Sequence, residues 1–77
     1  MKYGIYSLFD IKSGAYAQPF YAPNRAVALR HLEAGREDEN SLLSKFPGDF
    51  QLFELGTFND EAGNIEVSTV PTLISGV

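Results

Sequence analysis

Residues 19–30, Pro-Phe-Tyr-Ala-Pro-Asn-Arg-Ala-Val-Ala-Leu-Arg, constrain the fold more than any other part of this chain. Pro23 disfavours helical backbone at the residue before it, and Asn24 is well placed to accept hydrogen bonds from the first amides of a helix. Apolar residues then recur at helical spacing to about residue 37, which predicts one amphipathic helix over about 25–37. Its core-facing stripe comprises Val27, Ala28, His31, Leu32 and Gly35.

The residues before that helix predict two strands of unequal quality. Residues 2–9 are rich in aromatic and branched side chains on both faces, which favours a central strand. Ser13-Gly14 marks a turn. Residues 15–21 return as an edge strand or an extended loop, because Pro19 cannot donate a ladder hydrogen bond.

The residues after the helix predict a short helical turn and a hairpin. Ser41 to Phe46 form the turn, which Pro47-Gly48 stops. Residues 50–58 and 64–70 form the paired strands, with Gly63 taking a positive φ in the turn between them. Pro71 ends the last strand.

We therefore expect an α+β fold: a small antiparallel sheet of three to four strands with one main helix packed on one face, in the order β-β-α-β-β. Residues 1–71 form a single domain. The apolar C-terminal tail, 72–77, is either frayed or at a subunit interface.

The chain is short and has no cysteine, so neither disulfides nor thiolate metal sites support it. A chain of 77 residues can bury only a small hydrophobic core. Small domains without disulfides or metals are commonly stabilised by self-association. We therefore expect a homo-oligomer. The N-terminus is not a secretory signal and no apolar run is long enough to span a bilayer, which predicts a cytosolic protein with no membrane partner.

Enzyme chemistry finds little support in these residues. A cysteine nucleophile is impossible, and His31 is the only histidine. Its place in the apolar stripe favours a packed, neutral imidazole over a general base. The acids at 37–39 and 60–61 match no calcium loop and are typical of solvated surface. We expect no catalytic residue, no metal and no cofactor.

Aromatic residues and cations gather in the first part of the chain. Residues 1–32 hold four cations against one acid, a net charge of +3, whereas residues 33–77 carry −7. Rings for base stacking and cations for phosphates are what single-stranded DNA binding requires. The candidate nucleic-acid-binding residues are Lys2, Tyr3, Lys12, Tyr16, Tyr21, Arg25 and Arg30.

A competing interpretation assigns these tyrosines to the core or to an oligomer interface, and the charges to ordinary solvated surface. Four phenylalanines with no cationic neighbour beyond Lys45 are assigned to packing: Phe46, Phe50, Phe53 and Phe58.

Residues 19–30, together with Phe46-Pro47-Gly48-Asp49-Phe50-Gln51-Leu52-Phe53-Glu54-Leu55-Gly56-Thr57-Phe58-Asn59-Asp60, resemble the small nonstructural protein of gokushovirus-type microviruses, which are tailless phages with circular single-stranded DNA. The similarity runs from about residue 3 to the Val70-Pro71 region. It implies a protein of the host cytoplasm, absent from the capsid, that assists viral DNA synthesis or the switch toward making and packaging single strands. It implies no catalytic residues. His31 stands where an apolar residue is expected.

Two hypotheses of function remain open. In the first, a non-enzymatic viral protein assists DNA replication or packaging through protein contacts and weak single-stranded DNA binding. In the second, a homo-oligomeric interaction module engages a host or capsid factor and has no nucleic-acid role. The candidate partners are further copies of the chain, single-stranded DNA, and viral replication or capsid proteins.

Overall fold

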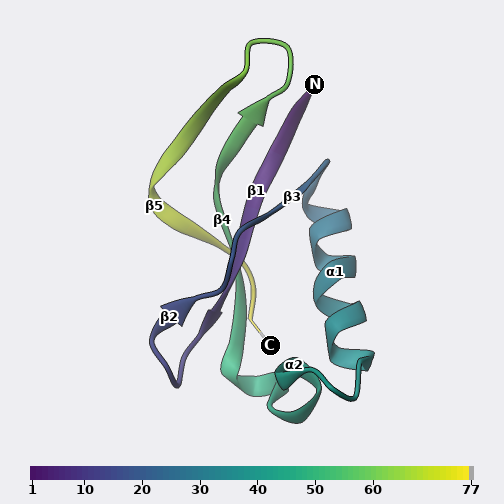
Figure 1. The fold of residues 1–77 in the computed structure, drawn as a ribbon. Coiled ribbons are helices and arrows are strands. Elements are labelled where there is room, and N and C mark those ends of the chain that lie inside the picture. The colour runs from purple at the N-terminus through teal and green to yellow at the C-terminus, as the bar shows by residue number, and fades with distance from the viewer. Residues whose placement is uncertain (77) are drawn as a thin grey trace.

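In the computed structural model, which describes residues 1–76, a twisted antiparallel sheet carries a helix along one side (Figure 1). In chain order the elements are β1 (Lys2–Asp10), β2 (Ala15–Tyr16), β3 (Phe20–Ala22), α1 (Arg25–Glu37), α2 (Leu42–Lys45), the 3-10 turn η1 (Pro47–Asp49), β4 (Phe50–Asn59) and β5 (Asn64–Gly76). The antiparallel sheet with a helix is as predicted. The strand number and order are not: five strands form the sheet, and three of them precede α1, so the expected order β-β-α-β-β is wrong.

β1 lies in the middle of the sheet, as its two apolar faces predicted. The strand order is β2-β1-β4-β5, and β3 also pairs with β1, beside β2 on the same edge. β5 forms the other edge, beyond β4. Strands far apart in the sequence, β1 and β4, therefore make the centre of the molecule.

The extra strand arises because residues 15–21 do not pair with β1 continuously. β2 pairs with Phe9 and Asp10, and β3 pairs with Gly4 to Tyr6. Between them Pro19 has no amide hydrogen to donate, so the ladder is interrupted there. The interruption is bridged by Ser7, whose hydroxyl donates to the carbonyl of Ala17 at 2.7 Å. The predicted edge strand is thus two short strands.

α1 begins where the sequence predicted, at an Asn24 cap. The side-chain oxygen of Asn24 accepts a hydrogen bond from the Val27 amide at 2.9 Å, which satisfies one of the free donors of the first turn. α1 buries Ala28 and Leu32 against the sheet. The expectation of a packed His31 is wrong: the imidazole is exposed, with its ring centre 5.2 Å from that of Phe20.

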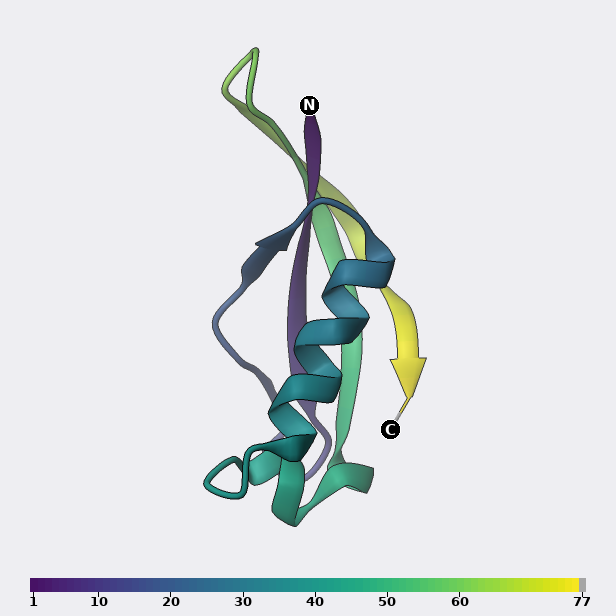
Figure 2. The same cartoon turned by 90° about the vertical axis from the view of Figure 1, so that its right-hand side faces the viewer.

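The core lies between α1 and one face of the sheet (Figure 2). Tyr6 and Leu52 are its largest fully buried apolar side chains. Gly35 of α1 is close to Leu43 of α2, and a Cβ there would lie 2.6 Å from the Leu43 Cδ1 atom. The absence of a side chain at Gly35 therefore lets α2 pack closely against α1.

The β4–β5 hairpin turns at Gly63, which has the predicted positive φ of 70°. β5 then continues beyond Pro71, so the predicted end of this strand is wrong. Thr72 and Leu73 pair with β4, and residues 72–76 are therefore part of the sheet and not a frayed tail. Val77 lies outside the described residues, and a subunit contact by this segment stays a prediction.

Pro71 is tolerated because β5 leaves its ladder for a few residues. The pairing jumps from Gly56–Val67 to Glu54–Thr72, so residues 68–71 have no partner on β4. A proline needs no ladder acceptor in such an unpaired stretch. In Figure 1 this is where β5 bows away from β4.

β4 also carries a bulge opposite β1. Ile5 pairs with Gly56 and Tyr6 pairs with Glu54, which leaves Leu55 as an extra residue. An extra residue reverses the alternation of side chains along the strand. The bulge therefore decides which of the β4 aromatic residues share a face.

Candidate functional site

One face of the sheet carries α1, and no other helix of residues 1–76 covers the opposite face (Figures 1 and 2). Directly paired residues of antiparallel strands point to the same face, so the register identifies the uncovered side chains. We call them the open face. They are Tyr3 and Phe9 of β1, Tyr16 of β2, Tyr21 of β3, Phe53 and Phe58 of β4, and Ile65, Val67 and Leu73 of β5.

The rings of the open face form two clusters. In the first, the Phe58 ring centre lies 6.5 Å from that of Tyr3 and 5.9 Å from that of Tyr21. These three rings and Asp60 line a hollow of about 520 Å³. The hollow is wide enough for a flat or ring-shaped group of a partner.

The second cluster lies toward the other end of β1. The ring centres of Phe9 and Tyr16 are 4.8 Å apart, and that of Phe53 is 6.1 Å from Phe9 and 5.7 Å from Tyr16. The Phe53 ring meets both neighbours edge to face, an arrangement that aromatic quadrupoles favour. Because each ring contacts the other two, the three form one continuous aromatic surface.

Much of the open face is exposed to solvent. Val67 is 78% exposed, Tyr21 54% and Leu73 53%. Beneath these side chains, Ile5 and Ser7 are buried. The face is thus an exposed apolar surface that rests on buried side chains.

The open face has no charged side chain at the paired positions of the described strands. The charged residues of those strands alternate to the other side: Lys2, Asp10, Glu54 and Glu66. Phosphate groups are bound mainly through lysine and arginine. The paired positions of the open face therefore offer rings and aliphatic groups but no lysine or arginine for a phosphate.

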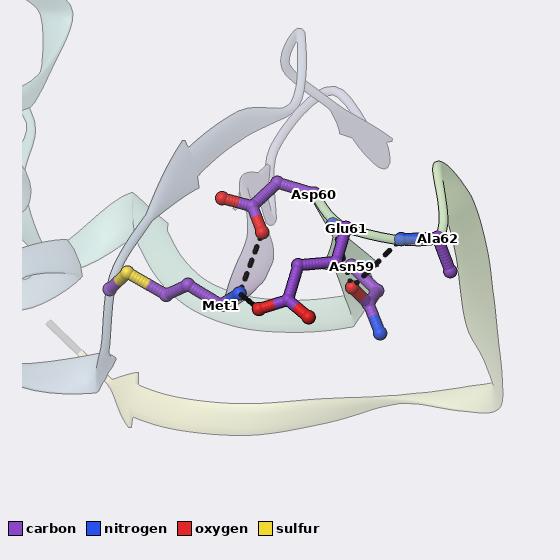
Figure 3. A network of polar contacts seen from close by, with 5 residues as sticks. All are labelled: Met1, Asn59, Asp60, Glu61 and Ala62. Atoms are coloured by element: carbon purple, nitrogen blue, oxygen red, sulfur yellow. Dashed lines mark hydrogen bonds and ion pairs between the residues drawn. The ribbon is translucent and has the colours of Figure 1, made fainter.

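A polar network joins the N-terminus to the β4–β5 turn (Figure 3), and one of its members, Asp60, lines the hollow. The N-terminal amine of Met1 pairs with Asp60 at 2.6 Å and with Glu61 at 3.2 Å. Asn59 accepts hydrogen bonds from the amides of Glu61 and Ala62, which orders the hairpin turn. Hydrogen bonds to Asp60 and then to Glu61 raise the pKa of the amine above its ordinary value of 8.0. Asp60, the acid that lines the hollow, is therefore paired with the amine.

The structure brings some of the predicted nucleic-acid-binding residues together and separates others. Tyr3, Tyr16 and Tyr21 all lie on the open face. Arg25 and Arg30 are on α1, on the other side of the sheet. A DNA-binding role for the three tyrosines stays a prediction. The two arginines of the predicted set are not beside them.

The two lysines of the predicted set are also away from the rings. Lys2 alternates to the side of the sheet opposite Tyr3. Lys12 is in the turn after β1 and lines a separate hollow of about 330 Å³ with Leu42, Phe46 and others. The candidate set thus does not form one continuous path of cations and rings.

Arg25 is held by an acid on the helix side of the sheet. Its guanidinium lies 3.4 Å from the Glu54 carboxylate. Glu54 also acts on the buried Tyr6: burial raises the pKa of the Tyr6 hydroxyl, and the Glu54 carboxylate raises it further, while Arg25 acts in the opposite direction. These groups form a neutral, paired cluster beside the core.

The assignment of four phenylalanines to packing holds for Phe50, which packs against the core, and for Phe53 and Phe58, whose rings contact other rings. Phe46 is exposed, and Phe53 and Phe58 belong to the open face. Phe53 and Phe58 are an odd number of residues apart, so regular alternation puts them on opposite faces. The bulge at Leu55 puts them on one face, and only the neighbouring Gly56 hints at it in the sequence.

Within residues 1–76, no group of three or more histidine and acidic side chains is placed to hold a metal ion. Across the same residues, every helix is too short or too polar to cross a membrane.

The geometry defines a small α+β protein with one covered and one open sheet face. Its sequence matches the family model described as "Phage ORF5 protein" over residues 3–77. The chain therefore belongs to the Phage ORF5 protein family and is a phage protein. A comparison with curated proteins returned no match, and neither did one with solved structures.

Proposed function

We propose that this phage protein is a non-enzymatic nonstructural protein of a gokushovirus-type microvirus. It assists viral DNA replication, or the switch to single-strand synthesis and packaging, in the host cytoplasm. Membership of the Phage ORF5 protein family supports the phage origin. The resemblance of residues 19–30 and 46–60 to the microvirus nonstructural protein supports the finer assignment.

The protein acts through protein contacts, and the open face is the observation that carries this proposal. Its rings contact one another, its β5 side chains are largely exposed, and its paired positions have no charge. Contiguous exposed apolar surface on a small protein marks an interaction site. No catalytic role is assigned to His31, whose described surroundings are the Phe20 ring and a shallow hollow with Val27, Arg30 and Ala34.

Weak binding of single-stranded DNA is a second candidate, favoured by the hollow lined by Tyr3, Tyr21 and Phe58. Rings of this kind stack on bases without sequence preference. Asp60 at the same hollow and the distance of the arginines from it disfavour a phosphate path. Protein contact is therefore the main mode of action in this proposal.

The role in replication is tested in infected cells with a phage genome that has a stop codon early in this gene. Double-stranded and single-stranded viral DNA are quantified through one infection cycle. We expect the ratio of single-stranded to double-stranded DNA to fall, with restoration when the protein is supplied from a plasmid. Unchanged amounts of both forms would overturn the role.

Direct DNA binding is tested separately by titrating oligo(dT) into the purified protein and following tyrosine fluorescence. Stacking on Tyr3 and Tyr21 predicts quenching at low salt that disappears as salt rises. No quenching at low salt would remove this second candidate and leave protein contact alone.

A further inference from the structure

We infer that the partner of the open face is a second copy of this chain, packed sheet against sheet around a two-fold axis. This inference rests on the proposed function, in that it takes the open face to be a protein contact surface. It goes further by naming the partner and the residues at the contact.

Charge is the first argument for a second copy. Each chain has a net charge of −4, so two copies repel each other wherever acidic surface meets acidic surface. The paired strand positions of the open face are uncharged, since Glu54 and Glu66 alternate to the other side. At these positions two copies meet without opposing like charges, and Asp60 at the edge of the face is already paired with the Met1 amine. A two-fold axis makes one surface complementary to itself.

Area is the second argument. Strands of nine or ten residues at about 3.3 Å per residue, and four strands side by side at about 4.8 Å, give a face of roughly 30 by 19 Å. Two such faces cover roughly 1,100 Å², above the approximately 1,000 Å² that a specific interface needs. Two packed sheets lie about 10 Å apart, a spacing that side chains of this size fill.

The shape of a single copy gives the third argument. Its extents are 40 × 22 × 17 Å. The shortest of these is the thickness of one sheet and one layer of helices. A sheet whose two faces are both apolar is stable when both are covered. In this dimer Val67, Tyr21 and Leu73, all more than half exposed in one chain, become buried, and the molecule becomes a four-layer arrangement of helix, sheet, sheet and helix.

Sedimentation equilibrium of the purified full chain tests this inference, over roughly 1 to 100 µM protein. The expected mass is about 17 kDa, twice the 8.5 kDa of one chain. Val67→Glu places a charge in the contact and is expected to raise the dimer dissociation constant more than tenfold. Val67 is largely exposed in one chain, so the fold should be kept, as circular dichroism would verify.

The matched control is Val70→Glu. Val70 is on the same strand and is 71% exposed, but strand alternation points it away from Val67 and Leu73. We expect the dimer dissociation constant of the Val70→Glu variant to stay within about twofold of the wild-type value. If Val67→Glu does not fold, Leu73→Lys replaces it with the same expectation. A wild-type mass of one chain throughout the range, or equal weakening by Val67→Glu and Val70→Glu, would overturn the second copy.

Repeating the measurement with oligo(dT) separates the two possible occupants. A dimer that keeps its mass supports the second copy, whereas conversion at low salt into one chain bound to DNA would overturn it. Failure of this inference can be told apart from failure of the proposed function. Suppose that Val67→Glu disrupts the dimer but the stop codon leaves the amounts of both viral DNA forms unchanged. The dimer then stands, and only the role in replication is removed.

Discussion

β1 contributes apolar side chains to both faces of the sheet, but helices cover only one of these faces. On the helix side, Tyr6 and Leu52 are fully buried beneath α1 and α2. On the open face, Tyr3 and Phe9 are partly exposed, and Val67 of β5 is more exposed still. A chain with one long helix can cover one face only. Alternation along a strand therefore identifies two apolar faces, and the number of helices available decides which of them stays uncovered.

The largest expected effect comes from truncating leucines on the two faces. Leu52→Ala removes a side chain with 0% exposure, and we expect the free energy of unfolding to fall by about 3 kcal/mol. Leu73→Ala on the open face should cost less than about 1 kcal/mol at protein concentrations too low for association. Urea denaturation measures both. Equal losses would mean that the two faces do not differ as described.

The close approach of β4 and β5 beside the bulge is tested by adding a methyl group at Gly56. A Cβ there would collide with the carbonyl oxygen of Glu66 and lie 3.0 Å from the Val67 Cα atom. Backbone atoms cannot rotate away, so Gly56→Ala should cost roughly 2 kcal/mol. Gly48→Ala is the control, because a Cβ at Gly48 meets no atom within 4 Å. A neutral Gly56→Ala variant would show that β4 and β5 are not this close.

The Asn24 cap of α1 makes a smaller contribution to the free energy of unfolding than Leu52 and Gly56. Asn24→Ala removes the acceptor of the Val27 amide and should lower the free energy of unfolding by about 1 kcal/mol. Asn24→Ser keeps an acceptor and should restore most of that loss. Thermal or urea unfolding of the three proteins gives the comparison. If serine is no better than alanine, the cap does not start α1.

The smallest effect concerns the polar rim of the open face. The pKa of the Met1 amine is raised by Asp60 and Glu61, so this pairing stabilises the fold fully below pH 8 and is lost as pH rises through the raised pKa. Both partners are exposed, and the effect on stability is slight. Asp60→Asn should lower the amine pKa, followed by NMR titration, and Glu66→Gln should leave it unchanged. An amine pKa unaltered by Asp60→Asn would contradict the pairing.

Local features of the fold were predictable from the sequence because they depend on neighbouring residues. The Asn24 cap, the bounds of α1 and the positive φ of Gly63 follow from the side chains present. His31 was misplaced because helical spacing defines the buried stripe only to within a residue. The stripe runs through Ala28 and Leu32, and the imidazole falls at its border.

Features that depend on pairing between distant strands were not predictable in the same way. The split of residues 15–21 and the continuation of β5 past Pro71 are both set by what the opposing strand offers. At the candidate site the three tyrosines of the open face were predicted as a group. Their separation from Arg25 and Arg30 required the fold, since it depends on which side of the sheet α1 packs.

The most direct test of the central claim is an isotope-filtered NMR measurement on a mixture of labelled and unlabelled protein. We predict cross-peaks between the two copies from the rings of Tyr16, Tyr21 and Phe53, and from the methyl groups of Val67. Cross-peaks confined to side chains of α1 or α2, or none between copies at concentrations well above those of association, would contradict the account.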